Sequence, residues 1–333
     1  MYPWVKAVLA LIIISIISLI LFIFRDSLPE ISFGDDDKKT EEVAKPQPKE
    51  EVKPVEKVEV KAPVKVVEEV KITEPEKLTA PVKVEPELIK DSIYEQALKL
   101  FEAHKYSESR ELLWKAIADK KLTENDKLFW QYAELLDKIN TLIITTDLYV
   151  PDKIRHTIVA GDSLSKLAKR YKTTVETIKK TNNIPADRDT VFAGQSLSIY
   201  AGFWSVKAIK SQFKLILFDQ NRVFKVYDIA TGRQNRTPVA KFTIKTKQKN
   251  PDWCPPGRVV PFGHPDNPLG TRWMGLAEVD KVNSQHQGYG IHGTADPNSI
   301  GSSASNGCLR LRNEDVEELY DILPYRTFVE IVE

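Results

Sequence analysis

The amino-acid sequence predicts a multidomain chain with an apolar N-terminal transmembrane helix, a small α-helical unit, a β-α-α-β module and a mostly-β domain with one main helix. Three observations carry this prediction. A charge-free run opens the chain, a segment rich in Lys, Glu, Pro and Val follows, and apolar residues then change from helical spacing to strand alternation near Ser205. The 333 residues leave room for several compact units.

Composition narrows the classes of function. The 48 Lys and Arg residues nearly balance the 47 Asp and Glu residues, so the net charge gives no indication of a nucleic-acid partner. Two cysteines are too few for a disulfide framework, and they leave either two free thiols or one bridge. The histidines show no compact metal-ligand spacing, so we expect neither a metal nor a cofactor.

Residues 1–25 are predicted to form a membrane anchor. The run "AVLALIIISIISLILFIF" contains no charged residue and lies between Lys6 and Arg25. A helix needs about 20 apolar residues to cross the hydrocarbon core. The following "RDSLPE" does not resemble a signal-peptide cleavage site, so we expect an uncleaved, single-pass anchor in the cytoplasmic membrane. Positive charges on its two sides nearly balance and do not decide its orientation.

Residues 34–91 are predicted to be a disordered linker. They contain no aromatic residue, and Lys, Glu, Pro and Val dominate them. Such a segment buries too little apolar surface to offset its loss of conformational entropy. As a flexible coil it would span roughly 40–45 Å. Two interpretations stay open: a spacer that holds the rest of the chain away from a membrane, or a linker whose length is immaterial.

Residues 92–148 are predicted to form a small helical unit. Two segments repeat the apolar spacing i, i+3, i+4, i+7 of an amphipathic helix. The residues are Tyr94, Ala97, Leu98 and Phe101, followed by Phe129, Tyr132, Ala133 and Leu136. The stretch "YEQALKLFEAHKYSESRELLWKAI" weakly resembles a tetratricopeptide helical hairpin, but such arrays usually need three repeats. We therefore expect a packing unit, with binding of a protein partner as a further hypothesis.

Residues 154–201 predict the order β-α-α-β. A short β run is followed by a Gly-Asp-Ser turn, two short helices with N-capping residues, and a returning strand "AGQSLSIY". The stretches Gly161–Leu164, Leu167-Ala168 and Gly194–Leu197, together with Asn183, resemble the LysM module. The resemblance implies binding of N-acetylglucosamine-containing glycans such as peptidoglycan. Each residue also has a structural explanation. The candidate glycan contacts are Gly161, Asp162, Ser163, Leu164, Asn183 and Pro185.

Residues 205–333 predict the mostly-β domain. Apolar alternation on both sides of Asp219-Gln220-Asn221 indicates a hairpin, and "VAKFTI", "GYGIHG" and "RTFVEIV" continue the β character. One helix is expected after Asn313, for which that residue would serve as N-cap. The proline-rich segment Asn250–Trp273 is expected to be an ordered loop. It either covers a substrate or is a structural insertion, and the former is favoured.

The segment "YGIHGTADPNSIGSSASNGCLRLRN" holds the candidate chemistry. A reactive cysteine needs its thiolate form, and a histidine can take the thiol proton. Cys308 and His292 supply these groups. Asn306-Gly307 would allow a tight turn that exposes the sulfur and directs the amides of Gly307 and Cys308 towards a developing oxyanion.

These residues resemble the catalytic signature of the L,D-transpeptidases, in "IHGT…SIG…SNGCLRLRNEDV", with upstream counterparts in "TGRQNRTPVAKFTI" and "NPLGTRWMGL". The resemblance covers about residues 205–333. It implies that Cys308 is the nucleophile, that His292 is the general base and that the Gly293 carbonyl orients the imidazole. Further residues are implied to shape the oxyanion site and the substrate pocket, namely Ser305, Gly307 and Arg310.

Two positions keep alternatives open. The family usually has His where this chain has Asn306. The Asn amide can donate a hydrogen bond, but unlike an imidazole it cannot take up and release a proton near neutral pH. Arg310 would pair with a substrate carboxylate, or it is a solvated charge on a strand.

Cys254 adds a second thiol. A bridge between Cys254 and Cys308 would abolish nucleophilicity, and we expect two free thiols in the active form.

The expected function is that of a membrane-anchored peptidoglycan L,D-transpeptidase, whose catalytic domain faces the periplasm or cell wall. Cys308 would form a thioester with one stem peptide, and an amine of another stem would then form the cross-link. Two alternatives remain: an L,D-carboxypeptidase or hydrolase, in which water accepts the acyl group, and a non-catalytic wall-binding scaffold. Expected partners are peptidoglycan and the cytoplasmic membrane.

Overall fold

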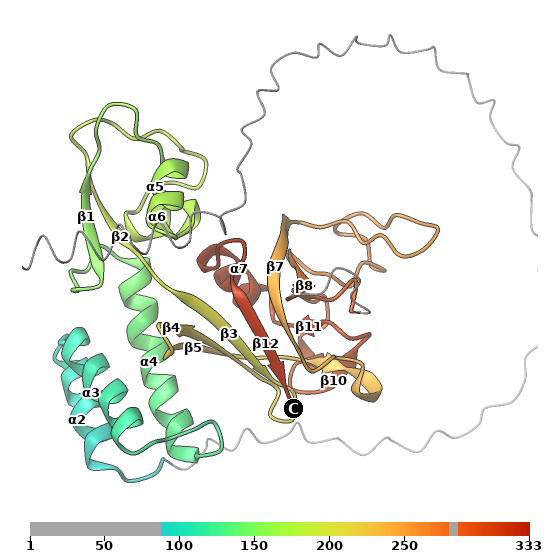
Figure 1. The fold of residues 1–333 in the computed structure, drawn as a ribbon, viewed down its shortest axis with the longest axis horizontal. Helices are drawn as coiled ribbons and strands as arrows, with labels where there is room; N and C mark the ends of the chain where they lie inside the picture. Colours follow the sequence, from blue (N-terminus) through green and yellow to red (C-terminus); the bar gives the residue numbers. More distant parts are fainter. Residues whose placement is uncertain (1–87, 280–285) are drawn as a thin grey trace, which may run out of the picture. The chain divides into compact units, whose positions relative to one another are not determined.

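The computed structural model describes residues 88–279 and 286–333 (Figure 1). The predicted anchor at residues 1–25 and nearly all of the predicted linker lie outside this part of the chain. No helix in the described ranges is both long enough and apolar enough to cross a membrane. Residues 80–333 form one compact unit, so the contacts within it can be described together.

Three helices open the described chain: α2 (Ser92–Glu102), α3 (Tyr106–Asp119) and α4 (Lys127–Thr145). The Asp91 side chain caps α2 by accepting from the amides of Ile93 and Tyr94. The apolar face of α4 is buried, and Tyr132 and Leu136 are fully enclosed. This is the face that the 3.6-residue spacing of the sequence indicates.

The module at residues 153–200 contains β1 (Lys153–Thr157), α5 (Leu164–Arg170), α6 (Val175–Thr181) and β2 (Ser196–Tyr200). Strands β1 and β2 pair antiparallel. Ser163 and Thr174 cap the two helices by accepting from the amides of Lys166 and Thr177. A small core of its own holds the module together, and the predicted β-α-α-β order is confirmed.

An eight-stranded sheet forms the remaining domain, in the order β11-β9-β8-β7-β12-β3-β4-β5. A short parallel pair of β6 and β10 lies beside it. The strands are β3 (Trp204–Ile209), β4 (Lys214–Asp219), β5 (Arg222–Asp228), β6 (Thr231–Gly232), β7 (Ala240–Lys249), β8 (Arg272–Glu278), β9 (Gly290–His292), β10 (Ser303–Ser305), β11 (Leu309–Arg310) and β12 (Phe328–Val332).

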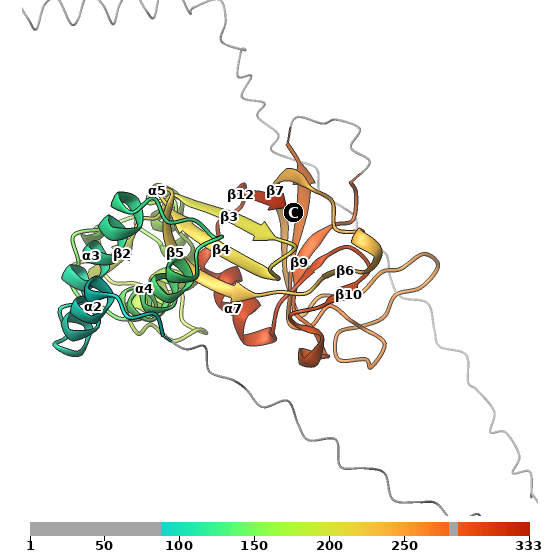
Figure 2. The ribbon, with the colours of Figure 1, turned by 90° about the horizontal axis from the view of Figure 1, so that it is seen from below.

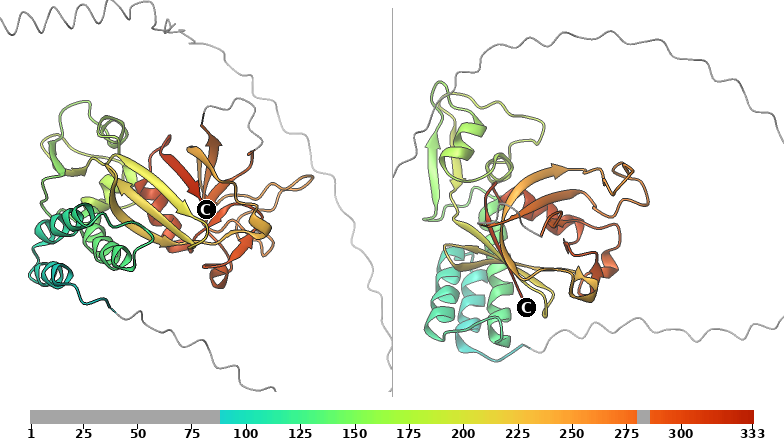
Figure 3. Two further views of the ribbon diagram at one scale, coloured as in Figure 1. Left: turned by 60° about the horizontal axis from the view of Figure 1, so that its bottom comes forward. Right: turned by 45° about the vertical axis from the view of Figure 1, so that its right-hand side comes forward.

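The predicted hairpin is confirmed between β4 and β5, where Gln220 and Asn221 have φ of 50° and 64°. The one main helix of this domain, α7 (Asn313–Ile322), buries Val316 and Leu319 and packs against β8 and β9. The long loop between β7 and β8 has little regular structure, as predicted, and extends away from the sheet (Figure 3).

The helical unit and the sheet share one hydrophobic core. Helix α4 lies against β5, the last strand of the sheet (Figure 2). Trp114 Nε1 donates to the Val223 carbonyl at 2.7 Å, and Asn140 Nδ2 donates to the Phe224 carbonyl at 2.9 Å. These side chains occupy backbone acceptors of an edge strand, which would otherwise be open to pairing with another chain.

Candidate active site

Parallel pairing of β9 and β11 brings the two candidate catalytic residues together. The register aligns Arg310 with His292 and Leu309 with Ile291. Cys308 directly precedes β11, so it lies two residues before Arg310, the register partner of His292. The Cys308 sulfur lies 3.7 Å from the Gly288 carbonyl oxygen, and no hydrogen bond joins it to His292 in the described structure.

His292 is buried, with 3% of its surface exposed. Its Nδ1 lies 2.6 Å from the Gly293 carbonyl oxygen, the contact that the resemblance implied. Since a carbonyl only accepts, Nδ1 carries the proton and Nε2 is left as the basic nitrogen. The Trp273 ring stacks on the imidazole at a centroid distance of 5.8 Å.

The surroundings keep both residues uncharged at neutral pH. Burial lowers the pKa of His292 to about 4, although the carbonyls of Gly293 and Leu269 act in the opposite direction. Burial also raises the pKa of the Cys308 thiol. The hydrogen bond from the Gly290 amide and the positive charge of Arg310 lower this pKa, but their effect is smaller. A neutral imidazole is the form that accepts a proton from a thiol.

Arg310 is half-buried in β11. Burial lowers the pKa of its guanidinium, and its Nε is buried without a hydrogen-bond partner in the described structure. A buried donor that lacks a partner is unusual in a folded protein. It fits the predicted pairing with a substrate carboxylate better than the alternative of a solvated strand charge.

A network of hydrogen bonds fixes the turn before Cys308. Gly307 has φ of +135°, and a Cβ there would lie 2.7 Å from the Tyr289 ring, so the position requires glycine. Ser305 Oγ accepts from the Gly307 amide at 3.0 Å and donates to the Cys308 carbonyl at 2.7 Å. The expectation that the Gly307 amide faces an oxyanion is therefore wrong in this state, because Ser305 occupies it. The Cys308 amide remains as the candidate.

Thr237 supports the same turn from a distant segment. Its hydroxyl donates to the Gly307 carbonyl at 2.8 Å and accepts from the Gly232 amide at 2.7 Å. Thr237 lies in the "TGRQNRTP" run, which the sequence analysis matched to the family without giving it a role. Nothing local to Thr237 indicates this contact.

Asn313 was predicted to be a helix N-cap, and this is wrong. The cap position is Arg312, and the Asn313 side chain points to the neighbouring loops. Its Oδ1 accepts from the amides of Thr271 and Thr294, each at 3.2 Å, and its Nδ2 donates to the Thr294 carbonyl at 3.0 Å. A Cβ on Gly293 would lie 2.2 Å from this Oδ1. Asn313 thus holds the backbone that follows His292.

Cys308 opens onto a cavity of about 930 Å³. Asn306, Tyr289 and Trp273 line it, together with Asn250–Cys254 of the long loop. Asn267 holds this loop by donating to the carbonyls of Pro251 and Val260. Cys254 is exposed in the same cavity, and both cysteines are free thiols.

The candidate glycan contacts of the module also have structural roles. Gly161 has φ of +89° in the turn before α5, and Asp162 accepts from His156 Nε2 at 2.9 Å and from the Val159 amide at 3.0 Å. Leu164 is buried. Ser163 and Leu164 line a second cavity, whereas Asn183 and Pro185 are not among its lining residues.

The neighbouring Asn182, which was not predicted, joins α6 to β2 through both atoms of its amide.

Comparisons with known proteins define the class: residues 204–331 match the L,D-transpeptidase catalytic domain family (YkuD), and residues 156–199 match the LysM domain. YkuD of Bacillus subtilis strain 168, whose name also classes it with the L,D-transpeptidases, is 32% identical over 185 residues, which cover 54% of this chain and 98% of that protein. The chain therefore belongs to the L,D-transpeptidase family.

A second relative from the same strain, YqjB, is 37% identical over 121 residues. That alignment covers 36% of this chain and 66% of YqjB, so the chain spans just under two thirds of this relative. Among solved structures, an L,D-transpeptidase from Mycobacterium smegmatis is 14% identical, with a TM-score of 0.32 over 43% of this chain and 65% of that chain. Likeness at this level adds nothing to the family assignment.

Proposed function

We propose that this protein is a membrane-anchored peptidoglycan L,D-transpeptidase that works through a cysteine thioester. The LysM and L,D-transpeptidase domains imply a peptidoglycan substrate. The observation that supports the mechanism is the position of Cys308 directly before β11, the strand that pairs with His292, at a cavity large enough for a peptide.

In the proposed reaction, neutral His292 takes the Cys308 proton as the sulfur attacks the peptide bond after the third residue of a tetrapeptide stem. The carbon–sulfur bond forms, the carbon–nitrogen bond breaks, and terminal D-alanine leaves with the proton from His292. An amine of a second stem then attacks the thioester, gives a proton to His292 and releases the thiol. Arg310 would hold a substrate carboxylate.

The proposed location is the cytoplasmic membrane, with the catalytic domain in the periplasm or on the cell-wall side. The charge-free run at Ala7–Phe24 and the position of peptidoglycan outside the membrane support it. Protease added to intact spheroplasts should remove the catalytic domain, and protection of that domain would contradict the proposal.

The reaction is tested by incubating the full-length protein with disaccharide-tetrapeptide and analysing products by mass spectrometry. A cross-linked dimer is expected, together with an acyl-enzyme that is absent from Cys308→Ala. Replacing His292 with Gln should slow acylation by roughly 10²–10⁴-fold, the usual contribution of a general base. A tripeptide product without dimer would identify a hydrolase, and undiminished cross-linking by Cys308→Ala would disprove the thioester.

A further inference from the structure

A cleft of about 540 Å³ lies between the LysM module and the catalytic domain. The module contributes Ser163 and Leu164 from the start of α5, and Ile184 and Ala186 from the segment after α6. The catalytic domain contributes Lys249 at the end of β7, Arg272 at the start of β8 and Asp321 in α7. The cleft therefore has one wall from each domain.

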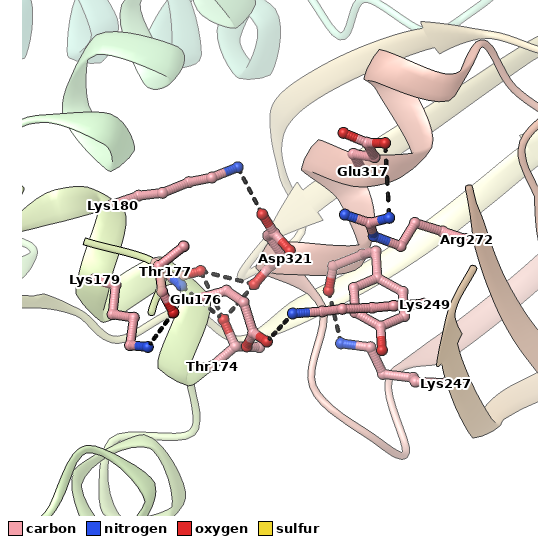
Figure 4. Close-up of polar contacts among 12 residues, drawn as sticks. Thr174, Glu176, Thr177, Lys179, Lys180, Lys247, Lys249, Arg272, Glu317 and Asp321 are labelled. Carbon is pink, nitrogen blue, oxygen red and sulfur yellow. Dashed lines mark hydrogen bonds and ion pairs between the residues drawn. The ribbon is translucent and has the colours of Figure 1, made fainter. Parts of the chain in front are cut away.

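Buried contacts hold these two walls at a fixed spacing (Figure 4). The hydroxyls of Thr174, the N-cap of α6, and of Thr177, within α6, both donate to the Asp321 carbonyl, the latter at 2.9 Å. Lys180 forms an ion pair with the Asp321 carboxylate at 2.7 Å. Since both threonine side chains are buried, this interface excludes water and the cleft is preformed.

The lining chemistry suits N-acetylated sugars whose attached peptides carry carboxylates. Leu164, Val175 and Ile184 supply apolar surface, and four cations face three anions. Lys249 pairs with Glu176 at 2.9 Å, but the two side chains are 50% and 31% exposed. An ion pair this exposed is weak, so a ligand carboxylate can replace Glu176 at little cost. Arg272 Nη1 donates to the Thr271 carbonyl at 2.8 Å and lies 3.6 Å from the Glu317 carboxylate (Figure 4), and its buried Nε has no hydrogen-bond partner in the described structure.

Lys249 also lines the cavity that contains Cys308. The cleft and the active-site cavity therefore share this lining residue. We propose that they form one extended site for a peptide-bearing glycan strand, in which the sugars lie against the module and Lys249 and Arg272 hold stem-peptide carboxylates. This proposal rests on the proposed function and deepens it, because it makes the polymer, rather than a free stem peptide, the preferred ligand.

The test measures binding by the full-length protein in mild detergent, with Cys308→Ala preventing turnover. The two probes are glycan oligomers of equal length, with and without tetrapeptide stems. Lys249→Gln and Arg272→Gln should each weaken binding of the peptide-bearing oligomer about tenfold, the usual effect of losing a charge-assisted hydrogen bond. Binding of the peptide-free oligomer should change by less than about twofold, since the sugar contacts are retained.

The matched control is Lys241→Gln, which removes another exposed lysine of β7 that pairs with Glu330 and lines neither cavity. It should change neither affinity. Equal weakening of both oligomers by Lys249→Gln and Arg272→Gln, or no weakening of either, would overturn the extended site. Because binding is measured without catalysis, this result is independent of whether the wild-type protein makes cross-links, which is the separate test of the proposed function.

Discussion

At the scale of single residues, the Cys308–His292 pair rests in its uncharged form. Burial raises the pKa of the thiol above its ordinary value of 9.0 and lowers that of the imidazole to about 4. Arg310 opposes the first shift, because its positive charge stabilises the thiolate. The thiolate is therefore scarce until substrate arrives or the pH rises.

The reactivity of Cys308 should increase with pH. In Cys254→Ala protein, which keeps one thiol, alkylation by iodoacetamide should accelerate through pH 9, with no separate step between pH 5 and 8, because His292 is already neutral there. Arg310→Gln should slow alkylation at pH 8 by roughly 3–10-fold, since loss of the cation raises the thiol pKa further. Mass spectrometry of the adduct gives the rates, and a plateau reached below pH 8 would contradict the resting state described here.

Asn313 should matter for both stability and activity. Asn313→Ala leaves the amides of Thr271 and Thr294 without their shared acceptor, so the free energy of unfolding should fall by about 1–3 kcal/mol. Urea denaturation measures this change. Acylation should also slow, because the backbone after His292 loses its support. Asn298→Ala, at an exposed site, is the control and should shift stability by no more than about 0.5 kcal/mol. Equal stability of the two variants would refute the assigned role.

Residues whose neighbours in the sequence indicate chemistry could be predicted. Residues whose role depends on contacts with distant segments could not. Cys308 stands out through the Asn-Gly turn before it, and His292 lies in a neighbouring strand pattern. Thr237 contacts the Gly307 carbonyl from a distant segment. Asn313 has the local pattern of a helix cap, and its real partners are visible only once the loops around Gly270 and Gly293 are placed.

At the scale of elements, the edge strand β5 depends on the helices that cover it. Asn140 is fully buried and donates to the Phe224 carbonyl, which lies at a bulge in the pairing of β4 with β5. Asn140→Leu should lower the free energy of unfolding by about 1–3 kcal/mol, because that carbonyl loses its donor inside the core. Asn125→Ala, in the exposed turn before α4, is the control and should have little effect.

The shared core also predicts one cooperative transition in the wild-type protein. Helical circular dichroism and tryptophan fluorescence should give the same urea midpoint for residues 88–333, since α4 and β5 bury a common interface. Separate midpoints would show that the helices unfold independently. The helices themselves were predictable from apolar spacing, but their docking on β5 was not, because an amphipathic pattern does not specify its partner surface.

At the scale of the whole molecule, the LysM module and the catalytic domain share a buried interface. The buried hydroxyls of Thr174 and Thr177 join α6 to the end of α7. The sequence predicted the order of these domains, but it gave no sign that they share an interface. Threonine at a helix N-cap is explained by the cap alone, so its second contact is invisible in sequence.

Removing both hydroxyls should loosen this interface. In Thr174→Val/Thr177→Val protein, amide hydrogen exchange in α7 should increase by about tenfold or more, as expected when a buried acceptor loses its donors. Exchange in α6 should rise as well, but because Thr174 is also the N-cap of α6, only α7 reports on the interface. Exchange in β3 and β4 should stay unchanged. Thr157→Val, on an exposed position of β1, is the control. Unaltered exchange in α7 would mean that other contacts hold the domains together.

The packing of α4 on β5 has a practical consequence for recombinant work. A fragment cut at the family boundary near Trp204 would expose the apolar surface of the sheet that Trp114 and α4 cover, and would be prone to aggregate. Inhibitor screening or crystallisation should instead start from a polypeptide that begins near Leu88. We expect such a polypeptide, which keeps the helices, to stay in solution where the shorter fragment does not.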